Sequence, residues 1–212
     1  MGLLRDLVMR IIETKVYEFK ELSEDAKLAA IEAVQNDEHY LSYDWWDSCY
    51  EWFDDKYGDL FNDIKPSFSG FWSQGDGASF LYSGIDNEKM LEKWMDEEKV
   101  TGTRRKLYEE YLEISSKGYR SGSHYVHENT VSHTIDFDLS HNNSLSGAYN
   151  VMDFVSELEC DFEHWLDIFY KDICRELYRR LDSEHDFLMS RESIEEHLIG
   201  NDLEFEKDGK QW

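Results

Sequence analysis

The feature that most constrains the fold is a long apolar repeat between residues 151 and 182. Apolar side chains recur there at steps of three and four residues, at Val155, Leu158, Phe162, Leu166, Phe169, Ile173, Leu177 and Leu181. This spacing places them on one face of an α-helix. About 30 helical residues extend about 45 Å at 1.5 Å per residue. The repeat therefore predicts one long helix that forms part of the core.

The charge balance limits which partners the protein can bind. The 212 residues include 47 acidic and 22 basic ones, which gives a formal net charge of −25. Such a chain repels nucleic acid and anionic membranes and favours basic partners. Disorder is the alternative for so charged a chain, but an aromatic content of 15% with seven Trp argues against it. We expect a folded protein that binds a protein partner with a basic surface, and neither nucleic acid nor a membrane directly.

The remaining patterns predict an α+β fold in which antiparallel hairpins or a small sheet pack with several helices. We expect one hairpin from strands near 66–73 and 78–83, and a second from 119–127 and 130–139 with its turn at Glu128-Asn129. We expect a single domain over 1–212, or a helical C-terminal subdomain over 151–212 beside the rest.

Shorter helices are indicated by their capping residues. These helices are expected from Ser23 to Asn36, from Asp44 to Gly58, after Asp86, from Thr103, and from a capping box at Ser193 to Gly200. Residues 11–19 and 203–205 read as strands.

The helix expected over 44–58 has two different faces. Trp46, Cys49, Tyr50, Phe53 and Tyr57 form an apolar stripe at helical spacing. Four carboxylates fall on another face, which we call the acidic face: Asp47, Glu51, Asp54 and Asp55. Carboxylates three or four residues apart on a helix lie about 5–6 Å from one another, a separation comparable to that of neighbouring phosphates. The acidic face can therefore occupy a site built for phosphates, or it can be a solvated surface that keeps the protein soluble.

The first hairpin carries the most distinctive local motif. Aromatic and hydroxyl residues run from Ser67 to Trp72, and Gln74-Gly75-Asp76-Gly77 follows with two residues that accept positive φ. We expect a tight turn there. Trp72, Gln74 and Asp76 are candidate partner-binding residues, and the alternative is a structural turn whose aromatic residues belong to the core.

Several segments resemble a family of small acidic bacteriophage proteins. The resemblance lies in Val16-Tyr17-Glu18-Phe19 to Lys27, in Tyr43-Asp44-Trp45-Trp46-Asp47, in Phe68 to Phe80, and in the tail from Ser193 to Gly209. Together they cover between a fifth and a quarter of the chain. Some members of that family carry the label of antitoxin in a toxin–antitoxin system. The resemblance implies a phage origin and supplies no catalytic residues.

No motif predicts an enzyme, a metal or a cofactor. His124, His127, His133 and His141 cluster in sequence, but His124 and His127 would lie on opposite faces of a strand. Asp136, Asp138, Ser140 and Asn142 mimic the start of a calcium loop, yet its Gly and Glu positions hold His141 and Gly147. We therefore expect no catalytic, metal or cofactor site; catalytic groups are assembled in space and need not be neighbours in sequence.

The three cysteines fit a reduced environment. Cys49, Cys160 and Cys174 form no CxxC pair and leave an odd count, so we expect the host cytoplasm, without secretion or a membrane anchor.

The favoured function is a non-enzymatic, phage-type acidic protein that inhibits a host defence or nucleic-acid-handling protein. An antitoxin that neutralises a cognate toxin and a small enzyme that uses the Gly-Asp-Gly loop are the alternatives.

Overall fold

The computed structural model describes residues 13–41, 44–120, 122, 125–139 and 149–212. The chain divides into two compact units. The terminal unit comprises residues 1–45 and 185–212, and the central unit comprises residues 46–184. The chain is therefore divided after residues 45 and 184, and not at residue 151, where the sequence suggested that a C-terminal subdomain begins. This division does not test whether the whole chain folds as one domain, which stays a prediction.

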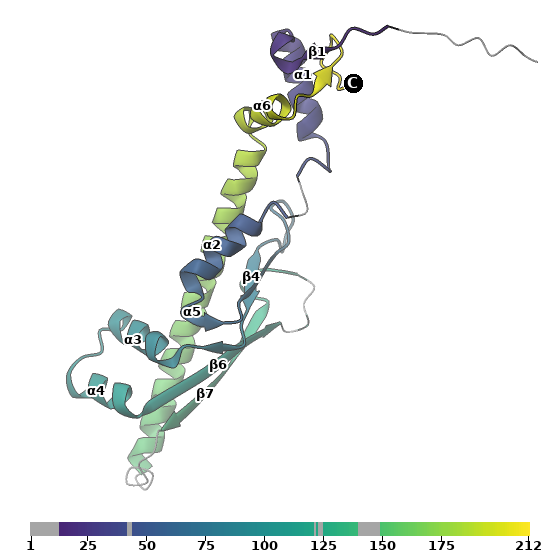
Figure 1. Ribbon diagram of the computed structural model, residues 1–212. Helices are drawn as coiled ribbons and strands as arrows, with labels where there is room; N and C mark the ends of the chain where they lie inside the picture. Colours follow the sequence, from purple (N-terminus) through teal and green to yellow (C-terminus); the bar gives the residue numbers. More distant parts are fainter. Residues whose placement is uncertain (1–12, 42–43, 121, 123–124, 140–148) are drawn as a thin grey trace, which may run out of the picture. The chain divides into compact units, whose positions relative to one another are not determined.

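The predicted long helix is confirmed and extends further at both ends. α5 spans Tyr149–Leu188 (Figure 1). In its described part the apolar repeat is buried at Leu158, Phe162, Leu166, Ile173, Leu177 and Leu181. The side chain of Val155 lies outside the described part. The other helices of the central unit are α2 (Asp47–Tyr57), α3 (Asn87–Glu97) and α4 (Gly102–Tyr111).

The strands of the central unit form antiparallel pairs. β2 (Phe61–Asn62) pairs with β5 (Gly84–Ile85), β3 (Lys65–Phe68) with β4 (Ala78–Leu81), and β6 (Leu112–Arg120) with β7 (Val131–Leu139). The α+β class is therefore confirmed. β7 packs against α5, since Phe137 and Phe162 are 5.6 Å apart by ring centroid (Figure 1).

Aromatic side chains fill the core of the central unit. Phe80 lies between Phe53 and Phe61, at 5.1 Å from each by ring centroid. The Tyr170 hydroxyl accepts a hydrogen bond from Phe80 N at 3.1 Å and donates one to Phe80 O at 2.8 Å. Burial raises the pKa of Tyr170 well above its ordinary value. Tyr170 thus ties α5 to the middle of β4 by both packing and hydrogen bonds.

Two predicted boundaries in the central unit are wrong. The second hairpin uses 112–120 rather than 119–127 as its first strand, and Leu112 is paired with Leu139. Glu128-Asn129 does form a turn, with Thr130 N bonded to His127 O at 3.0 Å, but β6 has already ended at Arg120. α2 begins at Asp47 with Trp46 at its N-cap, so Asp44 does not cap it.

The terminal unit joins the two ends of the described chain. β1 (Tyr17–Glu18) pairs with β8 (Glu204–Phe205), and a short 3-10 helix η1 (Phe19–Glu21) leads to α1 (Glu24–Gln35). The strand expected over 11–19 is therefore only Tyr17–Glu18 among the described residues. A small core contains Phe19, Ala30, Ile194, Leu198 and Phe205.

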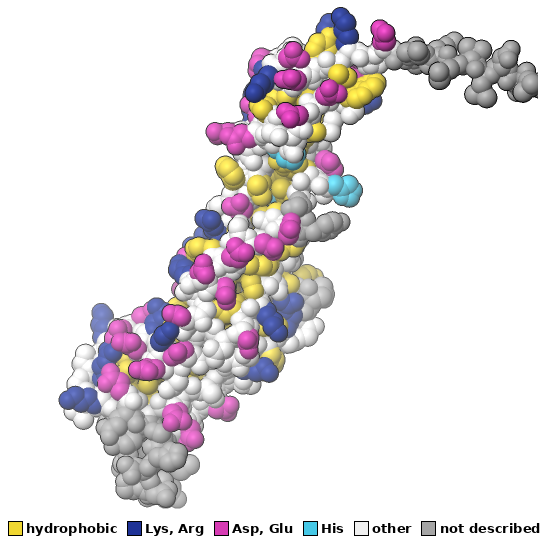
Figure 2. Space-filling model, viewed as in Figure 1, with side chains coloured by type: hydrophobic (Ala, Val, Ile, Leu, Met, Phe, Trp, Pro, Cys, Tyr) yellow, Lys and Arg dark blue, Asp and Glu magenta, His cyan; other side chains and the backbone are white. Residues whose placement is uncertain are grey.

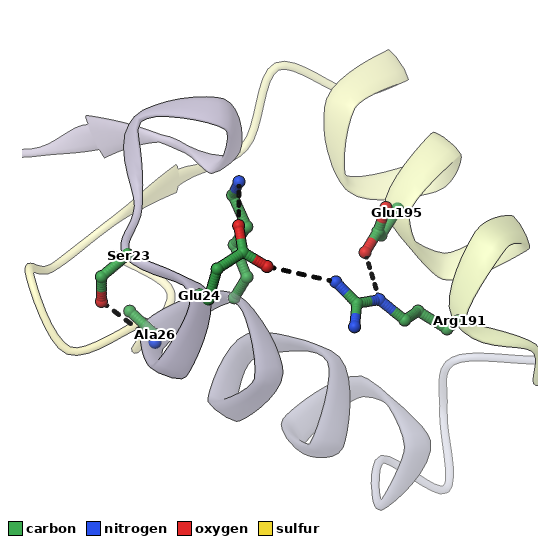
Figure 3. Close-up of polar contacts among 6 residues, drawn as sticks. Ser23, Glu24, Ala26, Arg191 and Glu195 are labelled. Carbon is green, nitrogen blue, oxygen red and sulfur yellow. Dashed lines mark hydrogen bonds and ion pairs between the residues drawn. The ribbon is translucent and has the colours of Figure 1, made fainter.

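Polar contacts hold α1 against α6 (Arg191–Gly200) in the terminal unit (Figure 3). Glu24 accepts from Lys27 at 2.9 Å and lies 3.6 Å from Arg191, which also contacts Glu195 at 2.6 Å. Ser23 accepts from Ala26 N at 3.3 Å, which confirms it as the N-cap of α1. The N-cap of α6 is Ser190 and not Ser193, whose backbone N–H is the donor to Ser190.

Candidate protein-binding site

The structure places the whole acidic face in solvent. Asp47, Glu51, Asp54 and Asp55 are all exposed on α2, whereas Cys49, Phe53 and Tyr57 are buried on the opposite side. The two faces predicted for this helix are therefore confirmed. Acidic side chains gather over the part of the surface that α2 occupies (Figure 2).

The buried side of α2 fixes the position of the acidic face. Phe53 is fully buried, and its ring centroid lies 5.1 Å from that of Tyr57. The Tyr57 hydroxyl and the Lys56 ammonium both donate to Glu176 on α5. Partial burial alone would raise the pKa of Glu176, but these two hydrogen bonds lower it. α2 is therefore held by aromatic packing and by a charged anchor outside the acidic face.

Ion pairs neutralise other parts of the surface but not the acidic face. Cations of the central unit pair elsewhere, for example Lys89 with Asp59 at 3.1 Å and Lys171 with Asp167 at 2.7 Å. Within the residues that the structure describes, no ion pair reaches any carboxylate of the acidic face. Like charges three or four residues apart on a helix repel one another. The acidic face is thus a fixed row of negative charges without internal compensation.

The connection between β3 and β4 is longer than the tight turn that the sequence predicted. We call residues 69–77 the aromatic loop. Asp76 organises it, because its Oδ2 accepts hydrogen bonds from Trp72 N at 3.0 Å and Ser73 N at 2.6 Å. The Tyr178 hydroxyl of α5 donates to Gly70 O at 3.1 Å. Asp76 therefore braces the loop from within, and α5 holds its first half.

The two glycines of the motif have different roles. Gly75 has φ of 99°, which only glycine adopts without strain, and a Cβ there would lie 2.8 Å from Tyr125. Gly77 lacks a positive φ, so the loop does not use the tolerance of this glycine for that conformation. A Cβ at Gly77 would lie 2.5 Å from His127, so this glycine is needed for close packing instead.

The aromatic loop presents an indole ring to solvent. Trp72 is 81% exposed and Gln74 is also exposed, while Asp76 is half-buried. Tyr125, which the sequence did not single out, is 48% exposed and lies beside Gly75. Nothing local in the sequence signals that residue 125 reaches the loop, because the contact joins segments about fifty residues apart.

A chain of ring contacts connects the aromatic loop to the start of α2. Trp46 contacts Phe68 with centroids 5.6 Å apart, Phe68 contacts Phe71 at 5.3 Å, and Phe71 contacts Trp72 at 5.9 Å. Trp46 directly precedes Asp47, the first carboxylate of the acidic face. The structure thus brings the two predicted partner-binding elements onto neighbouring parts of the central unit.

A cleft between α5 and β7 is the feature from which an enzymatic interpretation would start. It has a volume of about 570 Å³ and is lined in part by Cys160, His164 and His133. Cys160 and His164 are four residues apart, so they share a face of α5. The sequence contained that spacing, but not its proximity to His133. No group of three His, Cys, Asp or Glu side chains in the described part is arranged to hold a metal ion.

The calcium-like and histidine motifs do not form a single site. Asp136 and Asp138 lie on β7, opposite Ser115 and Glu113 of β6. Ser140, Asn142, His124 and His141 lie outside the described residues. Asp136, Asp138 and Glu113 line a second cleft of about 590 Å³.

The fold and surface define an α+β protein with an anionic helix face beside an exposed aromatic loop. The chain belongs to the family described as "Domain of unknown function (DUF8835)", whose profile matches residues 45–191. This range contains the acidic face and the aromatic loop and closely follows the central unit. No curated protein and no solved structure matches the chain significantly. Among the described residues, no helix is both long and apolar enough to span a membrane.

Proposed function

We propose that this protein is a non-enzymatic, phage-type binding protein that inhibits a host protein with a basic surface. The target is a defence or nucleic-acid-handling protein, whose phosphate-binding groove the acidic face occupies. One observation carries the proposal: four exposed carboxylates without an ion pair in the described structure lie on a helix whose other side is fixed in an aromatic core. Fixed geometry matters because a charge that is already positioned loses little conformational entropy on binding.

The net charge of −25 supports the same function at longer range. A dense field of one sign speeds the encounter with a partner of opposite sign. The same density destabilises the compact state through self-repulsion, an effect that a basic partner would relieve. Screening acts over about 8 Å at physiological ionic strength, so binding by this face should weaken steeply as salt increases.

A matched pair of charge reversals tests the proposal. The first variant carries Asp47→Lys, Glu51→Lys, Asp54→Lys and Asp55→Lys. The control carries Glu92→Lys, Glu98→Lys, Asp161→Lys and Asp182→Lys, four exposed residues outside both the acidic face and the ion pairs of the described structure. Each reversal changes the formal charge by eight, from −25 to −17. Surface substitutions usually change stability by only about 0.5 kcal/mol each, so both variants should fold.

Both variants and the parent serve as bait in host lysate at low salt and at about 1 M salt, where the screening length is only about 3 Å. We expect the parent and the control to retain the same protein at low salt and to release it at high salt, whereas the reversed acidic face retains none. If the variant with the reversed acidic face is folded and retains as much of the host protein as the parent does, the acidic face is only a solvated surface. If the retained protein is a small toxin encoded beside this gene, the antitoxin function is correct instead.

A further inference from the structure

Trp72 is unusual because its exposed ring is attached to a firmly held backbone. The indole is 81% exposed, yet the backbone N–H groups of Trp72 and Ser73 both bond to Asp76. Ser69 N also bonds to Gly77 O at 3.1 Å, which closes the base of the aromatic loop. Tryptophan is strongly enriched among the residues that dominate binding interfaces. A residue whose backbone is ordered before binding loses less conformational entropy when a partner covers its side chain.

One partner can cover both Trp72 and the acidic face. Three successive ring contacts of 5.6, 5.3 and 5.9 Å lead from Trp46, next to Asp47, to Trp72. A protein interface of standard size buries about 800 Å² on each side, a patch roughly 30 Å across. The exposed indole and the first carboxylates of the acidic face therefore fall within the reach of a single interface.

The chemistry of the surface selects the kind of side chain that it binds. The indole face is the strongest aromatic partner for a cation, and a planar guanidinium also stacks on it, whereas an ammonium does not. The central unit already contains such contacts: the Arg180 guanidinium lies 5.8 Å from the Trp52 ring centroid, and the Lys56 ammonium lies 5.2 Å from it. A cation approaching Trp72 is further favoured by the carboxylates of the acidic face.

We propose that the aromatic loop and the acidic face form one binding surface for an arginine-rich segment of a partner protein, with one guanidinium stacked on the Trp72 indole. This inference rests on the proposed function and adds the chemistry of the partner: arginine in preference to lysine. The carboxylates attract any cation and make binding sensitive to salt. Trp72 supplies the discrimination between arginine and lysine, because arginine combines positive charge with a flat stacking surface and lysine does not.

The test uses two synthetic peptides, an arginine decamer and a lysine decamer, as probes. Affinities are measured for the parent, for Trp72→Ala, and for Trp212→Ala as a matched control, since Trp212 is also exposed, at 65%, but lies in the terminal unit. We expect the parent to bind the arginine decamer about fivefold more tightly than the lysine decamer. A ratio of this size corresponds to the strength of one cation–π contact at an exposed or partly desolvated site. Trp72→Ala should remove this preference, and Trp212→Ala should preserve it.

An NMR spectrum of the indole N–H groups provides an independent readout. The resonance that disappears in Trp72→Ala belongs to Trp72, and the arginine decamer should shift it more than the lysine decamer does. Absence of an arginine preference in the parent, or its survival in folded Trp72→Ala, would overturn the inference. The proposed function fails by a different result, namely equal retention of the host protein by the reversed acidic face and by the control reversal.

Discussion

At the scale of single residues, His133 shows how packing changes the chemistry of an ionisable side chain. Its ring lies 4.6 Å from that of Tyr170 by centroid, and its Nδ1 is 2.9 Å from the Tyr82 hydroxyl. Burial lowers the pKa of His133 to about 4; the Asp167 carboxylate opposes this shift and Lys171 adds to it. His133 is therefore neutral at pH 7 and belongs to a polar contact inside the central unit.

This shift predicts a loss of stability in acid. Between pH about 6.5 and about 4, the unfolded chain binds a proton at His133 that the folded chain does not, so the free energy of unfolding falls as pH decreases through that window. His133→Gln should be less stable than the parent at pH 7, because it loses the ring packing. The difference between the two proteins should shrink below pH 6.5, as urea titrations across this range can measure. A difference that stays constant from pH 7 to pH 4 would contradict the assignment.

At the scale of elements, local patterns predicted the helices better than the strands. The apolar stripe of α2, the repeat of α5 and the caps of α1 and α3 are local in sequence, and the structure confirms each of them. β6 was misplaced because its inward positions include Ser116 and Gly118, which hide the alternation. Those positions are small because Tyr82 fills the space: its hydroxyl is 2.9 Å from Ser116 Oγ, and a Cβ at Gly118 would lie 2.5 Å from its ring.

The same distinction applies to the candidate site. The acidic face follows from helical spacing alone, so the sequence was enough to find it. The braced geometry of the aromatic loop, the approach of Tyr125 and the cleft beside Cys160 depend on contacts between distant segments. Such contacts leave no periodic signal in a single sequence.

The cap of α1 offers a test at the element scale. Ser23→Ala removes the acceptor for Ala26 N and should destabilise the terminal unit by about 1 kcal/mol. Ser23→Asp should recover most of that loss, because aspartate also caps and its charge suits a helix N-terminus. Hydrogen exchange of the first amides of α1 reports the local effect. Equal exchange in the parent and in Ser23→Ala would show that the cap does not stabilise this helix.

At the scale of the whole molecule, the excess of 25 negative charges is unevenly compensated. Ion pairs engage carboxylates on α3, α4 and α5, as in the contacts of Arg105 with Asp96 and Glu109. The acidic face has no such compensation in the described structure, and it lies within the range that defines the family. These two observations support the proposal that the acidic face and the aromatic loop of the central unit form the binding surface.

The most direct test of this account asks whether the acidic face replaces nucleic acid on its partner. The host protein captured by the parent is bound to a fluorescently labelled duplex, and the anisotropy of the duplex is followed while the parent, the reversed acidic face or the control reversal is added. We predict that the parent and the control release the duplex, and that the variant with the reversed acidic face leaves it bound. Release of the duplex to the same extent by that variant, or simultaneous binding of the duplex and the parent, would contradict the account.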